Sequence, residues 1–241
     1  MMSSTADSGR GQNLMPEATL EAGLARFGFN SFRPGQREAV ETLLEQKKLL
    51  LVAPTGGGKS LTYQLPASLL SGTTIVISPL IALMHDQVQS LEEKGIAATF
   101  LASTLNPEEA KERMRKMAEG QYKLVYVAPE RLTFPGFRNL VHNLNCPLIA
   151  VDEAHCISEW GHDFRPEYMR IGEFIQDMPQ AAILACTATA TPFVRDEILA
   201  RLGLGSDTPQ LIKGFARPNL ALRATDTTGK KDRHRHVDRL L

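Results

Sequence analysis

The sequence predicts an α/β fold with an open, mostly parallel sheet and helices on both of its faces. From residue 48 onward, short apolar runs alternate with segments of helical periodicity, which is typical of strands joined by helical crossovers. The apolar runs are continuous rather than alternating, as expected for strands that are buried on both faces. A glycine-rich loop joins the first run to the helix that follows it.

The predicted strands are six apolar runs at residues 49–53, 74–77, 97–101, 123–127, 148–151 and 181–186, and residues 210–215 are a candidate seventh. Helices are predicted at residues 16–27, 35–46, 59–70, 80–94, 107–119, 168–176 and 192–202. Pro107 and Pro192 suit the first turn of a helix, because the N–H group that proline lacks has no partner there in any case.

The pattern divides the chain into three parts. Residues 1–15 are polar and are expected to form a flexible tail. Residues 16–215 carry the strand–helix pattern and are expected to form one domain, which a chain of 241 residues can hold. Residues 216–241 have a looser pattern and contain a basic, histidine-containing stretch at 230–239. We interpret this last part as a linker and the first turn of something absent from the sequence.

Composition limits the class of protein. Hydrophobic residues make up 43% and charged residues 22% of the chain, and the formal net charge is +0. Any contact with nucleic acid must therefore come from a local track of side chains. The start lacks a secretory signal, and no apolar run approaches the roughly 18 residues that span a bilayer. We expect a soluble cytoplasmic protein, associated with the nucleoid if bacterial, without a membrane partner.

The three cysteines, Cys146, Cys156 and Cys186, have no metal-ligand spacing and are odd in number. Thiols in such a pattern are typically reduced side chains of a cytosolic protein. We therefore expect no zinc site in this chain.

A phosphate-binding loop is predicted between the first strand and the next helix. Its residues are Thr55, Gly56, Gly57, Gly58, Lys59 and Ser60. Glycines let consecutive N–H groups face the phosphates, and the helix N-terminus adds about half a positive charge. Lys59 can contact the phosphates, and the Ser60 hydroxyl can ligate Mg²⁺. The general pattern begins with glycine where this sequence has Ala53; the alternative is a glycine-rich turn that binds nothing.

An acidic cluster follows the strand at 148–151. Asp152, Glu153 and His155 lie at the carboxyl end of this strand, the edge at which open parallel sheets bind ligands. Asp152 can hold Mg²⁺, largely through water, and Glu153 is placed to deprotonate an attacking water. His155 is suited to relay contacts across the site. The alternative is a solvated acidic strand end.

Two further segments are predicted to couple DNA to this site. Thr187 and Thr189 follow the last strong strand and can hydrogen-bond to the acidic cluster, whereas Thr191 suits the cap of the next helix. A loop shortly after Glu153 carries aromatic and basic side chains, Trp160, His162, Phe164 and Arg165. Aromatic rings there can stack on bases, at about 1–3 kcal/mol each. The alternative is that the rings plug the core.

Phe29, Arg33 and Gln36 precede the phosphate loop at a spacing that lets a ring, a cation and an amide converge. A glutamine amide can both donate to and accept from an adenine edge, and Phe29 could stack on the base. The alternative is an ordinary helix cap.

Together these motifs resemble the RecQ family of superfamily 2 DNA helicases, from about residue 20 to residue 219. The matching segments are the adenine-reading motif at 27–36, the phosphate loop with its Ala53, the DNA-backbone motifs at 78–87 and 128–131, and the run from Asp152 to Pro166. The last run is the most specific, because its aromatic loop separates this family from DEAD-box RNA helicases.

The resemblance implies a RecA-like P-loop domain that uses ATP and Mg²⁺, binds single-stranded or forked DNA, and takes part in 3′-to-5′ unwinding. It implies DNA contacts at Ser78, Pro79 and Leu80 and coupling through the aromatic loop. A complete member also has a second RecA-like domain, which gives an arginine to the γ-phosphate and is not in this sequence. Weak ATP hydrolysis by the isolated chain is therefore expected. An RNA helicase domain and a non-catalytic nucleotide-binding module are the alternatives.

Overall fold

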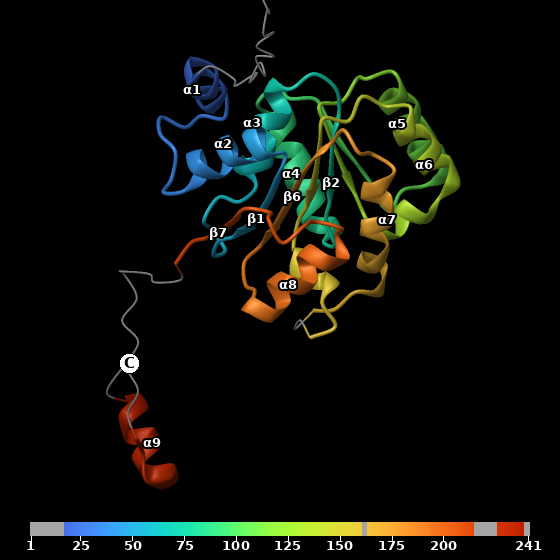
Figure 1. Ribbon diagram of the computed structural model, residues 1–241. Coiled ribbons are helices and arrows are strands. Elements are labelled where there is room, and N and C mark those ends of the chain that lie inside the picture. The colour runs from blue at the N-terminus through green and yellow to red at the C-terminus, as the bar shows by residue number, and fades with distance from the viewer. Residues whose placement is uncertain (1–16, 161–162, 215–225, 239–241) are drawn as a thin grey trace, which may run out of the picture.

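Every strand pairing in the described part of the chain is parallel. The computed structural model describes residues 17–160, 163–214 and 226–238. The strands are β1 (Lys48–Val52), β2 (Thr74–Ile77), β3 (Ala98–Leu101), β4 (Leu124–Val127), β5 (Leu148–Val151), β6 (Ala182–Thr187) and β7 (Gln210–Ile212). They form one sheet in the order β3-β4-β2-β5-β6-β1-β7 (Figure 1). All six predicted strands are confirmed to within one residue at each end, and the candidate seventh is β7.

The helices that connect the strands follow most of the predicted segments. They are α1 (Glu17–Arg26), α2 (Gln36–Gln46), α3 (Leu61–Leu69), α4 (Ile81–Glu92), α5 (Pro107–Ala118), α6 (Pro135–His142), α7 (Ile171–Gln176), α8 (Pro192–Arg201) and α9 (Gly229–Asp238). Short 3₁₀ helices occupy Pro129–Thr133, Ala154–Ile157 and Pro166–Arg170. The helices at Pro107 and Pro192 begin with these prolines, as predicted.

Three segments differ from the prediction. Helix α6, which is only eight residues long, was not predicted. Its buried side chains Phe137 and Val141 pack in the second hydrophobic core. The segment predicted as one helix at 168–176 begins as a 3₁₀ turn and becomes α-helical only at α7. Residues predicted to contain only a first helical turn form α9. The predicted tail at 1–15 lies outside the described residues, and so does the linker apart from residues 226–238.

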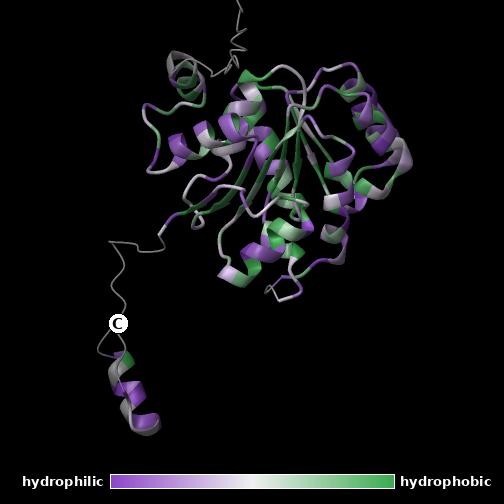
Figure 2. Cartoon of the chain, viewed as in Figure 1, coloured by the Kyte–Doolittle hydropathy of each residue, from purple (hydrophilic) through white to green (hydrophobic). Residues whose placement is uncertain are grey.

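The sheet separates two hydrophobic cores, because successive side chains of a strand point to opposite faces. In β1, Leu49 and Leu51 pack with α1–α4, whereas Leu50 and Val52 pack with α5–α8. Figure 2 shows this arrangement as hydrophobic strands between helices that carry hydrophilic residues on the outside. Burial on both faces explains the continuous apolar runs of the sequence.

Sheet order places three loops side by side at the carboxyl edge. Strand β6 lies between β1 and β5 and is paired with both. The loops after β1, β6 and β5 are therefore neighbours, at the roughly 4.8 Å spacing of adjacent strands. These loops carry the phosphate loop, the threonine segment and the acidic cluster.

Helix α8 has a side-chain cap, and the cap gives a stability prediction. The Thr191 hydroxyl accepts a hydrogen bond from the backbone N–H of Val194 at 3.3 Å, as predicted for Thr191. We expect Thr191→Ala to lower the free energy of unfolding by about 0.5–2 kcal/mol. Urea denaturation would measure this loss, with Thr104→Ala, at an exposed turn residue, as the matched control. Equal stability of the two variants would contradict it.

Candidate functional site

The phosphate loop leaves β1 and enters α3 through Ser60. Gly56 and Gly58 have φ angles of 79° and 78°, a left-handed backbone in which a side chain would be strained. A Cβ on Gly57 would come within 2.8 Å of the Pro54 carbonyl oxygen. The loop thus needs glycine at these positions, and its shape is that of a backbone concavity that can bind an anion.

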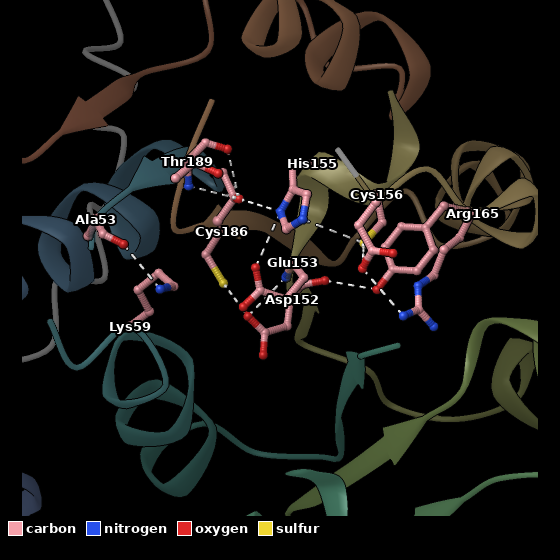
Figure 3. Close-up of polar contacts among 12 residues, drawn as sticks. Ala53, Lys59, Asp152, Glu153, His155, Cys156, Arg165, Cys186 and Thr189 are labelled. Carbon is pink, nitrogen blue, oxygen red and sulfur yellow. Dashed lines mark hydrogen bonds and ion pairs between the residues drawn. The ribbon is translucent and has the colours of Figure 1, made fainter. Parts of the chain in front are cut away.

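Lys59 lies in the concave loop, with Ser60 immediately before the first residue of α3. The Lys59 ammonium donates to the carbonyl of Ala53 at 3.1 Å, from one side of the loop to the other (Figure 3). Both residues lie at the N-terminus of a helix, where the helix dipole favours a negative charge. The structure therefore brings the cation and the hydroxyl to one place, as a phosphate and Mg²⁺ site requires.

The start of α2 and the residues just before it contact the phosphate loop. The side-chain amide of Gln36 donates to the Gly58 carbonyl at 3.0 Å and accepts from the Arg33 backbone N–H at 2.8 Å. The Arg33 guanidinium donates to the Gly56 carbonyl. Phe29 is exposed, as a stacking surface would be. Adenine reading by these residues stays a prediction, and it would require the Gln36 amide to exchange at least one contact with the chain for one with the base.

Asp152 is a buried carboxylate at the end of β5. Its Oδ1 accepts from the Cys186 thiol at 3.4 Å and from the backbone N–H of Glu153 at 3.0 Å. Burial raises the pKa of Asp152, the charge of Glu153 raises it further, and Lys59 opposes the rise. A cation beside this carboxylate would favour its charged form, because opposite charge offsets desolvation.

His155 connects the acidic cluster to the threonine segment. Its Nδ1 lies 2.7 Å from the Thr187 hydroxyl and 3.3 Å from Oε2 of Glu153 (Figure 3). The Thr187 hydroxyl donates its own proton to the carbonyl of Thr189 at 3.2 Å, so Nδ1 is the donor in the first contact. Glu153 itself has a φ of 48°, a strained backbone of the kind found at functional sites. Thr187 thus contacts the cluster through His155, whereas Thr189 bonds to Thr187 through its backbone. The relay role of His155 and the coupling role of both threonines stay predictions.

The aromatic loop presents its rings to solvent. Trp160 is 76% exposed and Phe164 is 36% exposed, so these rings do not plug the core. The Arg165 guanidinium donates to the carbonyl of Pro79 at 3.2 Å and also contacts Asp163. The loop is thereby tied to the first predicted DNA-backbone motif. His162, predicted to bind DNA, lies outside the described residues.

The first DNA-backbone motif is only partly exposed. Leu80 is 44% exposed, Pro79 is partly buried, and Ser78 is 1% exposed. DNA binding by all three residues stays a prediction, and the burial of Ser78 counts against a direct contact of its side chain.

Two residues of the site were not predicted. Cys186, interpreted above only as a reduced thiol, donates to Asp152, and Tyr168 donates from its hydroxyl to the Asp152 backbone carbonyl at 3.0 Å. The signal for Cys186 was its position one residue before Thr187 on the neighbouring strand. No pattern pointed to Tyr168, which comes from a segment 16 residues further along the chain.

Among the described residues, His155, Cys156 and Asp163 place potential metal-ligating atoms within 4.8 Å of one another. Burial raises the pKa of Cys156 to about 12. A metal ion bound there would therefore have to displace the proton of this thiol, because a cysteine ligand binds as the thiolate.

The donor set fits Mg²⁺ and a nucleotide. Ser60 and Asp152 offer a hydroxyl and a carboxylate, the hard oxygen ligands that Mg²⁺ takes, and the burial of Asp152 gives a cation a role in stabilising its charge. The left-handed backbone at Gly56 and Gly58 gives the loop the curled shape from which backbone N–H groups can bind a phosphate. With the loop after β1 and the acidic cluster after β5 at the same edge, the fold and site are those of a RecA-like P-loop domain.

Comparison with known proteins identifies the family. The family model of the DEAD/DEAH box helicases matches residues 33–197, and the chain belongs to this family. It is 46% identical over 206 residues to the ATP-dependent DNA helicase RecQ of Bacillus subtilis, and 46% identical over 194 residues to that of Haemophilus influenzae. The expected resemblance to the RecQ family is confirmed, and the chain corresponds to the helicase motor domain of these proteins.

The two alignments cover 85% and 80% of this chain but 35% and 31% of the relatives, so the chain spans about a third of their length. Among solved structures, that of Mss116p bound to ssRNA and AMP-PNP superimposes with a TM-score of 0.63 at 15% identity, covering 84% of this chain and 44% of that one. This likeness confirms the fold. None of the helices in the described part of the chain combines the length and hydropathy that crossing a bilayer requires.

Proposed function

We propose that this chain is the first motor domain of a RecQ-type DNA helicase, and that it binds ATP and Mg²⁺ and couples ATP hydrolysis to movement on single-stranded or forked DNA. The observation that carries the proposal is the grouping of Lys59, Asp152, Glu153 and His155 at one sheet edge, with an exposed aromatic loop attached to the same strand. Such a domain would work where DNA is found, in the cytoplasm or on the nucleoid if the organism is bacterial.

The residues of the site divide the chemistry of ATP hydrolysis among them. The loop backbone and Lys59 hold the phosphates, and Ser60 and Asp152 hold Mg²⁺, which neutralises phosphate charge when it is bound. Glu153 accepts the proton of the attacking water. The Nδ1–H of His155 is 3.3 Å from Glu153 and orients this carboxylate while it also bonds to Thr187.

DNA would act on this site through the aromatic loop. The short 3₁₀ helix Ala154–Ile157 joins the acidic cluster to the loop, and Arg165 ties the loop to Pro79. A base stacked on Trp160 or Phe164 would therefore pull on a segment that is continuous with Glu153 and His155. This route supports coupling of DNA binding to hydrolysis.

Nucleotide binding by the 241-residue chain tests the proposal. We expect Mg²⁺-dependent binding of a fluorescent ATP analogue, weakened roughly 10- to 100-fold by Lys59→Ala, since a hydrogen bond to a charged group is worth about 1.5–3 kcal/mol. Lys111→Ala, at an exposed position of α5, is the matched control and should bind like the wild type. Lack of binding, or equal binding by all three proteins, would disprove the proposed site.

The DNA part of the proposal has its own readout. Labelled single-stranded DNA should bind the chain, and unlabelled DNA should displace it more effectively than RNA of the same sequence. A preference for RNA would favour an RNA helicase domain instead, and no binding of either polymer would favour a nucleotide-binding module.

A further inference from the structure

One face of α8 contacts three consecutive residues at the start of the aromatic loop. Phe193, Glu197 and Arg201 are four residues apart on α8, so they lie on the same side of the helix. We call this side the docking face. The residues that it contacts are Ser158, Glu159 and Trp160.

The central contact of the docking face is a hydrogen bond. The hydroxyl of Ser158, which is fully buried, donates to the Glu197 carboxylate at 2.6 Å and accepts from the backbone N–H of Trp160 at 3.2 Å. Arg201 lies 3.6 Å from Glu197 and 3.8 Å from Glu159. The hydroxyl thus fixes the backbone of Trp160 to the helix.

The outer contact is aromatic. The rings of Trp160 and Phe193 are in a T-shaped arrangement, 6.2 Å between centroids and 86° between planes. Trp160 and Phe193 are 76% and 59% exposed, so Trp160 keeps most of its surface open for a base while it contacts Phe193.

Together with a contact at the proposed ATP site, these contacts connect the aromatic loop to the rest of the domain at two places. The segment after β5 is joined to the end of β6 by His155 and Thr187, and to α8 by Ser158 and Glu197. Two short helices, the 3₁₀ helix Ala154–Ile157 and α8, span the distance between the two joints and pack on each other in the second core. A shift at the first joint would displace the second, because packed helices move as units.

We propose that the docking face of α8 is a positioning surface that transmits the state of the ATP site to Trp160. Phe193, Ser158 and Glu197 are its positioning residues, and none of them needs to touch ATP or DNA. The inference rests on the proposed function, since it requires a nucleotide at the phosphate loop. In addition to the direct connection along the chain from Glu153 to the aromatic loop, the ATP site and Trp160 would then be connected through β6 and α8.

The single tryptophan of the chain makes the proposal measurable. Trp160 emission and its quenching by acrylamide would be recorded with and without a saturating, non-hydrolysable ATP analogue and Mg²⁺. In the wild type, the nucleotide is expected to change the quenching constant of Trp160. In Ser158→Ala and Glu197→Gln this change should fall to less than a quarter, while the affinity for the nucleotide stays within about twofold of the wild type.

Asp196→Asn is the matched control, because Asp196 is an exposed carboxylate on the same helix next to Glu197. It should keep the full response. The unchanged nucleotide affinity shows that the variants are folded, and a purely structural role would not remove the response while it leaves affinity intact. A wild type that binds nucleotide without any change at Trp160 would overturn the inference, and so would variants that respond like the wild type. A wild type that binds no nucleotide would overturn the proposed function instead.

Discussion

ATP turnover by this chain is expected to rise by roughly 10³–10⁵-fold when a second RecA-like domain is joined to it, because an arginine that reaches the γ-phosphate contributes that much to phosphoryl transfer. This factor corresponds to about 4–7 kcal/mol of activation free energy. In the described part of the chain, the guanidinium groups of Arg33 and Arg165 donate to the backbone carbonyls of Gly56 and Pro79, and the Lys59 ammonium donates to that of Ala53.

The test is a fusion protein in which the part of the Bacillus subtilis relative that follows the matched region is joined to residue 214. Steady-state ATP hydrolysis of the chain and of the fusion would be compared with and without single-stranded DNA. The same fusion with Lys59→Ala is the control and should show background turnover. Turnover above about 1 s⁻¹ by the unfused chain, stimulated by DNA, would contradict the prediction and would indicate that the site is completed by another copy.

The substitution Glu153→Gln is expected to lower the rate of hydrolysis in that fusion protein by about 10²–10⁴-fold, the usual contribution of a general base. The variant keeps the shape of the side chain, and it keeps the strained backbone, since both residues face the same cost at a φ of 48°. The amide can still accept from His155 but cannot take the proton of water. Single-turnover hydrolysis measures the loss, and nucleotide binding should be unchanged.

Glu173→Gln is the matched control for this substitution, because Glu173 is exposed on α7. It should hydrolyse ATP like the wild type. If Glu153→Gln stays within threefold of the wild type, Glu153 is not the base, and the proton must pass to another group of the cluster.

The sheet was predictable because its strands are buried on both faces and carry unbroken apolar runs. Local signals also placed Thr191, Pro107 and Pro192 correctly, since caps and first-turn prolines act within one helical turn. Helix α6 was missed because eight residues give too little periodicity to separate them from a loop. The order of the strands could not be read from any local pattern, because β1 pairs with strands that come much later in the sequence.

The chemical groups of the site were predictable because they lie in short segments that follow recognisable strands: Lys59 in the loop after β1, and Asp152, Glu153 and His155 after β5. Their contacts were not. The Cys186 and Tyr168 bonds to Asp152 depend on which strands are neighbours and on how α7 is reached. The hydrogen bonds of Gln36 and Arg33 to the phosphate loop likewise depend on how the start of α2 packs against the loop. The spacing of residues in the sequence does not determine this packing.

The position of β6 between β1 and β5 also sets the order of events during synthesis. Lys48 in β1 pairs with Ile183 in β6, so the first strand has no partner on its β6 side until more than half of the chain has been made. At 5–20 residues per second, this interval is on the order of ten seconds. The phosphate loop and the acidic cluster cannot be joined before then. A nucleotide site that uses both segments can therefore form only after β6 has been made.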